Sequence, residues 1–163
     1  EAPILPDFEV SEMCHIRPQV SLRKAGAADL KPLNTRCQTA LRLAMWERHG
    51  IQPAAQRHLG QAVREITHFS SYNCRQIRTT GSAPPRMSTH ATADAIDVSG
   101  FILKDGQRIT LKNDWDKTAK SSEFLKEVRD SACDWFRVTL SPDYNALHAD
   151  HFHLQHSGWG LCR

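Results

Sequence analysis

The stretch HADHFH, residues 148–153, constrains the fold most strongly, because it places three histidines and one aspartate in six positions. A buried imidazole needs a hydrogen-bond partner or a bound ion. If the stretch is a β-strand, His151 and His153 project from one face and Phe152 enters the opposite layer. The pattern therefore predicts two neighbouring imidazoles. They could bind a metal, take part in catalysis or only form hydrogen bonds.

A second group of polar residues lies upstream, where His90 and Asp97 are seven positions apart. Asp97 lies between Ile96 and Val98 in an apolar run, and an isolated buried charge is too costly to leave unpaired. A salt bridge to a nearby arginine is one solution. Combined with one histidine of the HxH pair, however, His90 and Asp97 make a three-ligand set of nitrogen and oxygen, which is typical of a catalytic zinc site.

Hydrophobic periodicity predicts both helices and strands after residue 34, and the residues KDGQ at 104–107 predict a tight turn between two strands. The expected helices are 35–50, 53–59 and 121–136, and the expected strands are 62–72, 93–103, 108–111, 137–141 and 151–157. This mixture predicts an α+β fold in a single domain, with a mostly antiparallel central sheet flanked by helices.

The N-terminal residues 1–33 differ from the rest because they contain four prolines and little periodicity. Proline lacks a backbone N–H and is rare inside central strands. We therefore expect an irregular N-terminal arm over residues 1–33, wrapped over a domain that spans residues 34–163.

Composition excludes several classes of function. The net charge is only +3 and the basic residues are scattered, whereas a nucleic-acid-binding protein usually carries a dense basic stripe. The apolar runs are too short for a membrane span. The chain begins at Glu1 without a charged-then-apolar leader, so we expect a mature form whose export signal is absent from this sequence.

The five cysteines are widely spaced and form no CxxC pair, which favours disulfides in an oxidising compartment over a thiolate zinc site. Cys162 is close to the C-terminus, where a bridge would restrain the end of the chain. We expect the pairs Cys133–Cys162 and Cys14–Cys37, with Cys74 left over.

The two histidine motifs together resemble those of the LAS group of zinc peptidases. The pattern SxHxxxxAxD (Ser88, His90, Ala95 and Asp97) followed by a late HxH is found in D-Ala-D-Ala carboxypeptidases, penicillin-insensitive murein endopeptidases and the Hedgehog signalling domain. The segments SYNCR, DAIDVSGF and LSPDYNALHADHFHLQ are similar to the bacterial extensin-like C-terminal family, over roughly residues 30–163. The resemblance implies a LAS/Hedgehog-like zinc peptidase core.

The resemblance also implies roles for individual residues. His90, Asp97 and His153 correspond to the ligands of a Zn2+ ion. His151 matches the histidine beside the attacking water, and His148 matches a further active-site histidine of the murein endopeptidases. Arg75 resembles an arginine that follows a Ser-Tyr turn in carboxypeptidase relatives, and His148 or Arg75 could stabilise an oxyanion.

Two residues depart from the pattern of the family. Ala93 stands where many members have glycine, so the loop there is expected to be less open. Asp150 stands where the dipeptidases have a longer glutamate. We therefore expect it to orient one of the active-site histidines through a hydrogen bond, without binding the metal itself. The resemblance leaves open which of His151, His148 and Asp150 acts as the general base.

The implied function is a zinc metallopeptidase that hydrolyses amide bonds next to D-amino acids in peptidoglycan stem peptides or cross-links. The histidine trio favours a DD- or LD-endopeptidase over a carboxypeptidase, and the resemblance leaves open whether 4–3 or 3–3 bonds are cut. We expect a monomer that is periplasmic or secreted and has no nucleic-acid partner. Two alternatives stay open, a non-catalytic zinc-stabilised cell-wall-binding module and a metal-free structural domain.

Overall fold

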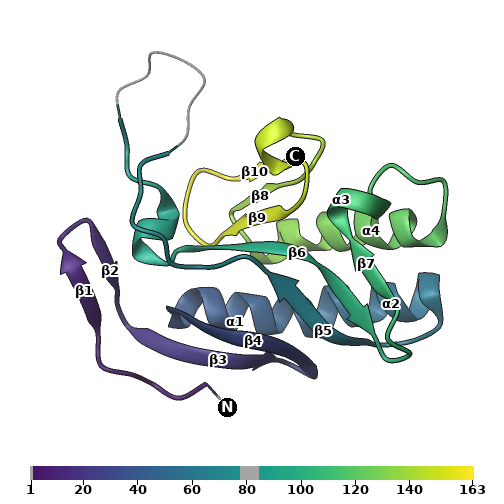
Figure 1. Ribbon diagram of the computed structural model, residues 1–163, viewed down its shortest axis with the longest axis horizontal. Coiled ribbons are helices and arrows are strands. Elements are labelled where there is room, and N and C mark those ends of the chain that lie inside the picture. The colour runs from purple at the N-terminus through teal and green to yellow at the C-terminus, as the bar shows by residue number, and fades with distance from the viewer. Residues whose placement is uncertain (1, 78–84) are drawn as a thin grey trace.

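One eight-stranded sheet organises residues 2–77 and 85–163, which are the residues that the computed structural model describes (Figure 1). Its strands lie in the order β10, β8, β9, β6, β5, β4, β3, and β7 pairs with β6. The strands of this sheet are β3 (Gln19–Ala25), β4 (Ala28–Arg36), β5 (Val63–His68), β6 (Ala95–Leu103), β7 (Arg108–Thr110), β8 (Val138–Leu140), β9 (Phe152–Gln155) and β10 (Leu161–Cys162). A separate two-stranded sheet is formed by β1 (Phe8–Ser11) and β2 (Cys14–Ile16).

The main helices pack against one face of this sheet (Figure 1). They are α1 (Cys37–Trp46), the π-helical turn η1 (Glu47–Ile51), α2 (Gln52–Leu59) and α4 (Lys120–Trp135), and the shorter helical segments are η2 (Thr89–Thr92), α3 (Leu111–Asp114) and η3 (Ala146–His148). No helix in the described part of the chain is both long and apolar enough to cross a membrane.

Trp46 lies at the centre of the core between the helices and the sheet. Its ring is fully buried and makes edge-to-face contacts with Phe101, Phe136 and Phe152, at centroid distances between 5.9 and 6.5 Å. The indole Nε1–H donates to the Val128 carbonyl of α4 at 3.1 Å, so the polar end of this large side chain is satisfied. These contacts fix α1, α4 and the two central strands against one another.

The sheet is mixed, which corrects the prediction of a mostly antiparallel one. The pairs β4–β5 and β8–β10 run parallel, and the remaining neighbours run antiparallel. Parallel neighbours need a long crossover connection, and the helical run from Cys37 to Leu59 provides it between β4 and β5. The single-domain α+β class is confirmed.

The prediction of an irregular arm over residues 1–33 is wrong, because this region contributes β1, β2, β3 and most of β4. The prolines are accommodated at the margins of pairing. Pro18 immediately precedes β3, and Pro32 lies where the β3–β4 register shifts between the pairs Leu22–Leu33 and Lys24–Asp29. At such a bulge a residue without an N–H costs no ladder hydrogen bond.

The predicted break at Gly50 is also absent, because α1, η1 and α2 follow one another without interruption. Gly50 is buried, and a Cβ atom there would lie 2.4 Å from the Ser131 hydroxyl of α4. The glycine therefore allows close helix packing and does not end a helix. The other expected helix, 121–136, is confirmed as α4 with a shift of one residue.

Two disulfides link the chain. Cys133–Cys162 is confirmed and joins α4 to β10, but the second bridge is Cys14–Cys74 and not Cys14–Cys37. Cys37 begins α1 and its thiol is free and exposed. Cys14 is instead buried in β2 and bonds to Cys74, which lies in the segment that follows β5.

Candidate metal centre

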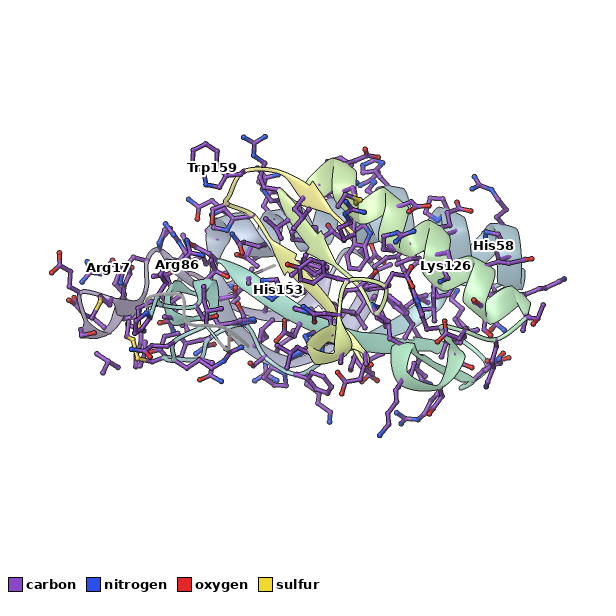
Figure 2. The ribbon with its side chains drawn as sticks, turned by 90° about the horizontal axis from the view of Figure 1, so that it is seen from above. Arg17, His58, Arg86, Lys126, His153 and Trp159 are labelled. Carbon is purple, nitrogen blue, oxygen red and sulfur yellow. A yellow bond between two sulfur atoms is a disulfide. The ribbon has the colours of Figure 1, made fainter. Side chains whose placement is uncertain are left out.

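The register of β6 and β9 brings two of the expected ligands together. These strands are antiparallel, and Asp97 pairs directly with His153. Because side chains alternate along a strand, both project from the same face of the sheet. Their neighbours enter the core beside the helices on the other face: Ile96, Val98, Phe152 and Leu154. The polar pair therefore lies on the face away from the main helices, and Figure 2 shows His153 on β9 near the middle of this view, between Arg86 and Lys126.

The third expected ligand, His90, belongs to η2. The Ser88 hydroxyl begins this short helix by accepting the His90 N–H at 3.3 Å. Ala93 ends it with φ of 52°, a left-handed conformation in which glycine is favoured and alanine costs about 1–2 kcal/mol. The Ala93 carbonyl accepts a hydrogen bond from the buried Thr39 hydroxyl at 2.9 Å, which helps to hold this strained turn in place.

The three side chains converge on one point. The Asp97 Oδ1 atom lies 3.1 Å from His90 Nε2 and 3.0 Å from His153 Nδ1, and the two ring nitrogens are 3.2 Å apart. His90 is 1% exposed. Its other nitrogen, Nδ1, lies 2.8 Å from the Ser71 carbonyl, which can only accept a hydrogen bond. The neutral His90 ring therefore presents its Nε2 lone pair to the group.

Electrostatics favour an ionised carboxylate at the centre of the group. Burial alone would raise the pKa of Asp97, but the imidazoles of His153 and His90, whose nitrogens lie 3.0 and 3.1 Å from its Oδ1 atom, outweigh this effect. The pKa of Asp97 therefore lies well below its usual range, and the side chain offers a negative oxygen at neutral pH.

The donor set fits a zinc ion. The ligand atoms of His90, Asp97 and His153 all lie within 4.8 Å of one another. Ligands about 2.0–2.1 Å from a tetrahedral zinc are roughly 3.3 Å apart, which is close to the separations within this group. Two imidazoles and one carboxylate are a usual composition for a catalytic zinc site that keeps one position open.

His151 and Asp150 form a pair beside the three ligands. The His151 Nδ1 atom lies 2.8 Å from Asp150 Oδ1, and its Nε2 atom lies 3.7 Å from Asp97 Oδ1. Because the Asp150 carboxylate accepts the Nδ1 proton, the neutral His151 ring presents a lone pair at Nε2 on the side of the ligands. The Phe69 ring packs edge-on against His151, with ring centroids 5.6 Å apart.

His148 lies beside both His151 and His153, with its ring centroid 5.2 and 5.9 Å from theirs. Burial, and then the neighbouring rings of His151 and His153, lower the pKa of His148 to about 4, so the ring is neutral at neutral pH. Its Nδ1 atom lies 2.8 Å from Asn145 Oδ1, which also accepts the Leu147 N–H. The Nδ1 atom must therefore donate, and the free lone pair of His148 lies on Nε2.

Arg75 is not joined to this group by a contact. Its Nη1 atom donates to the Gln76 carbonyl at 3.2 Å, and within residues 2–77 and 85–163 no hydrogen bond or ion pair connects it to the three ligands or to His151. The segment 71–75, which contains Arg75, instead contacts His90 through its backbone. The Ser71 carbonyl binds His90 Nδ1, the Asn73 N–H donates to the His90 carbonyl at 2.9 Å, and Cys74 anchors the segment to β2.

Sequence reasoning missed the residues that orient the imidazoles: Ser71, Asn145 and Gln155. Gln155 could have been found, because it continues the alternation of His151 and His153 onto the same face of β9. Ser71 could not, because its backbone carbonyl makes the contact and any residue type provides one.

Comparison with known proteins identifies the family of the chain. The family described as Extensin-like protein C-terminus matches residues 3–163, which is almost the whole sequence. Searches of curated proteins and of solved structures found no match. The chain thus belongs to the extensin-like protein C-terminal family.

Proposed function

We propose that this protein is a zinc-dependent peptidase that hydrolyses amide bonds next to D-amino acids in peptidoglycan stem peptides or cross-links. The observation that carries the proposal is the convergence of His90 Nε2, Asp97 Oδ1 and His153 Nδ1, with the lone pair of His151 beside them. The substrate class comes from the resemblance of these motifs to the LAS peptidases. Two disulfides are consistent with a periplasmic or secreted protein.

His151 is suited to act as the general base. Its Nε2 atom can take a proton from a water molecule at the site and then pass it to the leaving amine. The Asp150 carboxylate holds the Nδ1 proton and stabilises the imidazolium that forms in between. A zinc ion held by His90, Asp97 and His153 would polarise the scissile carbonyl and lower the pKa of the attacking water.

His148 is suited to a different task. A neutral ring whose Nδ1–H is committed to Asn145 has a lone pair and no proton on Nε2. Such a nitrogen accepts a hydrogen bond but cannot donate one to an oxyanion. We therefore assign His148 to accept an N–H of the substrate backbone, in place of the oxyanion role that its position in the sequence suggested.

The direct test is digestion of purified cell-wall sacculi by the zinc-loaded protein, followed by mass spectrometry of the released muropeptides. We expect opened cross-links or shortened stem peptides, and we expect a chelator to abolish them. Muropeptides that stay unchanged with stoichiometric zinc bound, across pH 5–9, would refute the proposal.

Matched variants separate catalysis from wall binding. His151→Ala should abolish cleavage and keep zinc, whereas His49→Ala, at an exposed histidine in η1, should leave both unchanged. If His151→Ala kept full function while His153→Ala lost sacculus binding, the protein would be a zinc-stabilised wall-binding module. If no metal bound even after zinc addition, the cluster would be only hydrogen-bonded.

A further inference from the structure

Two exposed aromatic rings border the imidazoles beside the candidate metal centre. Phe69 is 56% exposed, and its ring packs edge-on against His151 with centroids 5.6 Å apart. Tyr144 is 43% exposed and packs in the same way against His148, at 5.5 Å. Because His148 and His151 also contact each other, the four rings form one continuous group in which each histidine has an exposed aromatic neighbour.

The backbone fixes Phe69 relative to the candidate ligands. Its N–H donates to the Asp97 carbonyl at 2.9 Å, and the Asp97 N–H donates to the Ser70 carbonyl at 3.1 Å. The pairing with β6 thus continues past the end of β5 as far as the ligand itself. A ring on such a backbone loses little conformational freedom when a bound molecule contacts it.

The loop that carries Tyr144 is also fixed, through its neighbour Asp143. The Asp143 carboxylate accepts the indole N–H of the buried Trp115 at 2.8 Å. Within the loop, the Tyr144 N–H donates to the Ser141 carbonyl at 2.9 Å. Both aromatic side chains therefore project from anchored backbone, although the fold leaves much of their surface in water.

Exposed apolar surface of this kind is available to a ligand. Ligand pockets are lined mainly by apolar and aromatic side chains around a few polar groups that fix orientation. The candidate site has this composition, because its polar groups are the imidazoles and Asp97. The two rings lie next to His151 and His148, the histidines that the proposed mechanism brings into contact with the substrate.

We propose that Phe69 and Tyr144 are specificity-determining residues that bind aliphatic side chains of the substrate on the two sides of the cleaved amide bond. This inference rests on the proposed function, which supplies the direction of the substrate. His151 passes a proton to the leaving amine, so the residue that carries this amine lies beside His151 and contacts Phe69. The substrate extends from there past His148, so Tyr144 borders the residue on the acyl side.

The group bound by each ring is a C–H surface. The methyl group of D-alanine and the methylene chain of a diamino acid both offer one, and burying either against an aromatic ring removes apolar surface from water. Specificity at these two positions therefore depends on the apolar area of the substrate residue.

The first measurement is KM and kcat of the zinc-loaded protein on soluble cross-linked muropeptides. We expect Phe69→Ala and Tyr144→Ala each to raise KM about 4- to 15-fold, the effect of losing one or two methylene-sized contacts, and to keep kcat within about two-fold of wild type. Phe69→Leu should recover most of the loss, because it restores apolar surface. The matched control is Leu41→Ala, which removes a side chain that is 61% exposed on α1, on the opposite face of the sheet.

The split between KM and kcat distinguishes substrate contact from a structural role. Zinc affinity and melting temperature should stay at the wild-type values in both ring variants. A fall in kcat of Phe69→Ala with KM unchanged would show that the ring acts only by supporting His151, and would overturn the inference.

The second measurement assigns the two sides of the bond. Three synthetic substrates share the acyl side and differ only in the residue that carries the leaving amine, which is D-alanine, glycine or a diamino acid. One buried methyl group changes kcat/KM about four-fold, so wild type and Tyr144→Ala should prefer D-alanine to glycine by about that factor. Phe69→Ala should lose this preference. Whichever of D-alanine and the diamino acid loses more in Phe69→Ala is the better occupant, and a preference lost only in Tyr144→Ala would overturn the assignment.

The outcomes separate this inference from the proposed function. Equal KM of wild type, Phe69→Ala and Tyr144→Ala would overturn the inference and leave the peptidase proposal standing. If zinc-loaded wild type cleaved none of the substrates, their Kd values from isothermal titration calorimetry would replace KM. A Kd raised in both ring variants would then support the inference and refute the peptidase. If wild type bound none of the substrates, both would fail.

Discussion

Asp97 and His153 are direct partners across β6 and β9, although 56 residues separate them in the sequence. The backbone pairing places the carboxylate oxygen 3.0 Å from the ring nitrogen. Because side chains alternate along a strand, a slip of one residue in this register would turn His153 toward the helices. The geometry of the candidate metal centre therefore depends on the pairing of two strands as much as on the ligands themselves.

Zinc should stabilise the protein. A ligand that binds only the folded state at 100 times its Kd adds about 2.7 kcal/mol to the free energy of unfolding. We expect zinc to raise the melting temperature of wild type and of His49→Ala, measured by differential scanning fluorimetry after chelator treatment. Asp97→Asn and His153→Ala should lose this increase, and an undiminished increase in either variant would contradict the ligand assignment.

Asp150→Asn should slow catalysis without weakening the metal site. The asparagine keeps the size of the side chain but loses the charge that stabilises a protonated His151. We expect the rate of muropeptide release to fall about 10- to 100-fold, the usual effect of losing such a partner, while zinc affinity stays at the wild-type value. A variant that cleaves at the wild-type rate would show that Asp150 does not support the base.

Much of the candidate site could be predicted from sequence, because two simple patterns encode it. Alternation in HFH predicts that His151 and His153 share a face, and an aspartate in an apolar run predicts a partnered charge at Asp97. The meeting of the two segments depends on strand register, which alternation does not determine, and there the family resemblance was needed. The supporting contacts from the Ser71 carbonyl and the Asn145 side chain depend on loop geometry, which no pattern reports.

The fold was less predictable at the N-terminus. The strong apolar face of α4 predicted that helix, and the turn before β7 predicted the hairpin of β6 and β7. The four prolines, in contrast, led us to expect no strands where β1 to β4 lie. Proline at a bulge and proline in an irregular segment look alike in sequence, because partner strands decide between them. The same limit applies to Cys14, because its disulfide partner Cys74 is 60 residues away in the sequence, in the segment after β5.

The two disulfides should have different effects on the metal centre. Replacing either pair by alanine should lower the free energy of unfolding by about 3–5 kcal/mol, because each closes a long loop in the unfolded chain. Removing Cys14–Cys74 should also weaken zinc binding, since Cys74 anchors the segment that contacts His90. The Cys133→Ala/Cys162→Ala variant should keep wild-type zinc affinity, as should Cys37→Ala. Equal zinc affinity of both disulfide variants would show that the Cys14–Cys74 bridge does not support the metal centre.

Acid should destabilise the metal-free protein in part through His148. Burial and the neighbouring imidazoles lower its pKa to about 4, so the unfolded state takes up a proton first as the pH falls below about 6.5. The stability that depends on neutral His148 is complete above that pH and is lost progressively down to about pH 4.

The test compares urea unfolding of wild type and His148→Asn at pH 7.5 and pH 4.5, both in chelator. Wild type should lose more stability than the variant between these two pH values, because only wild type has at position 148 a group whose pKa is lowered by folding. Equal losses in the two proteins would contradict the lowered pKa of His148.

The central sheet separates hydrophobic packing from the polar residues, since Ile96 and Val98 point toward the helices while Asp97 points away from them. Residues that differ by one position along β6 are therefore subject to different physical constraints, close packing on one face and polar contacts on the other. On the face that carries the candidate ligands, a polar residue can therefore change while the packing that stabilises the protein stays intact. Relatives with this scaffold could therefore diverge in activity without first having to evolve a new fold.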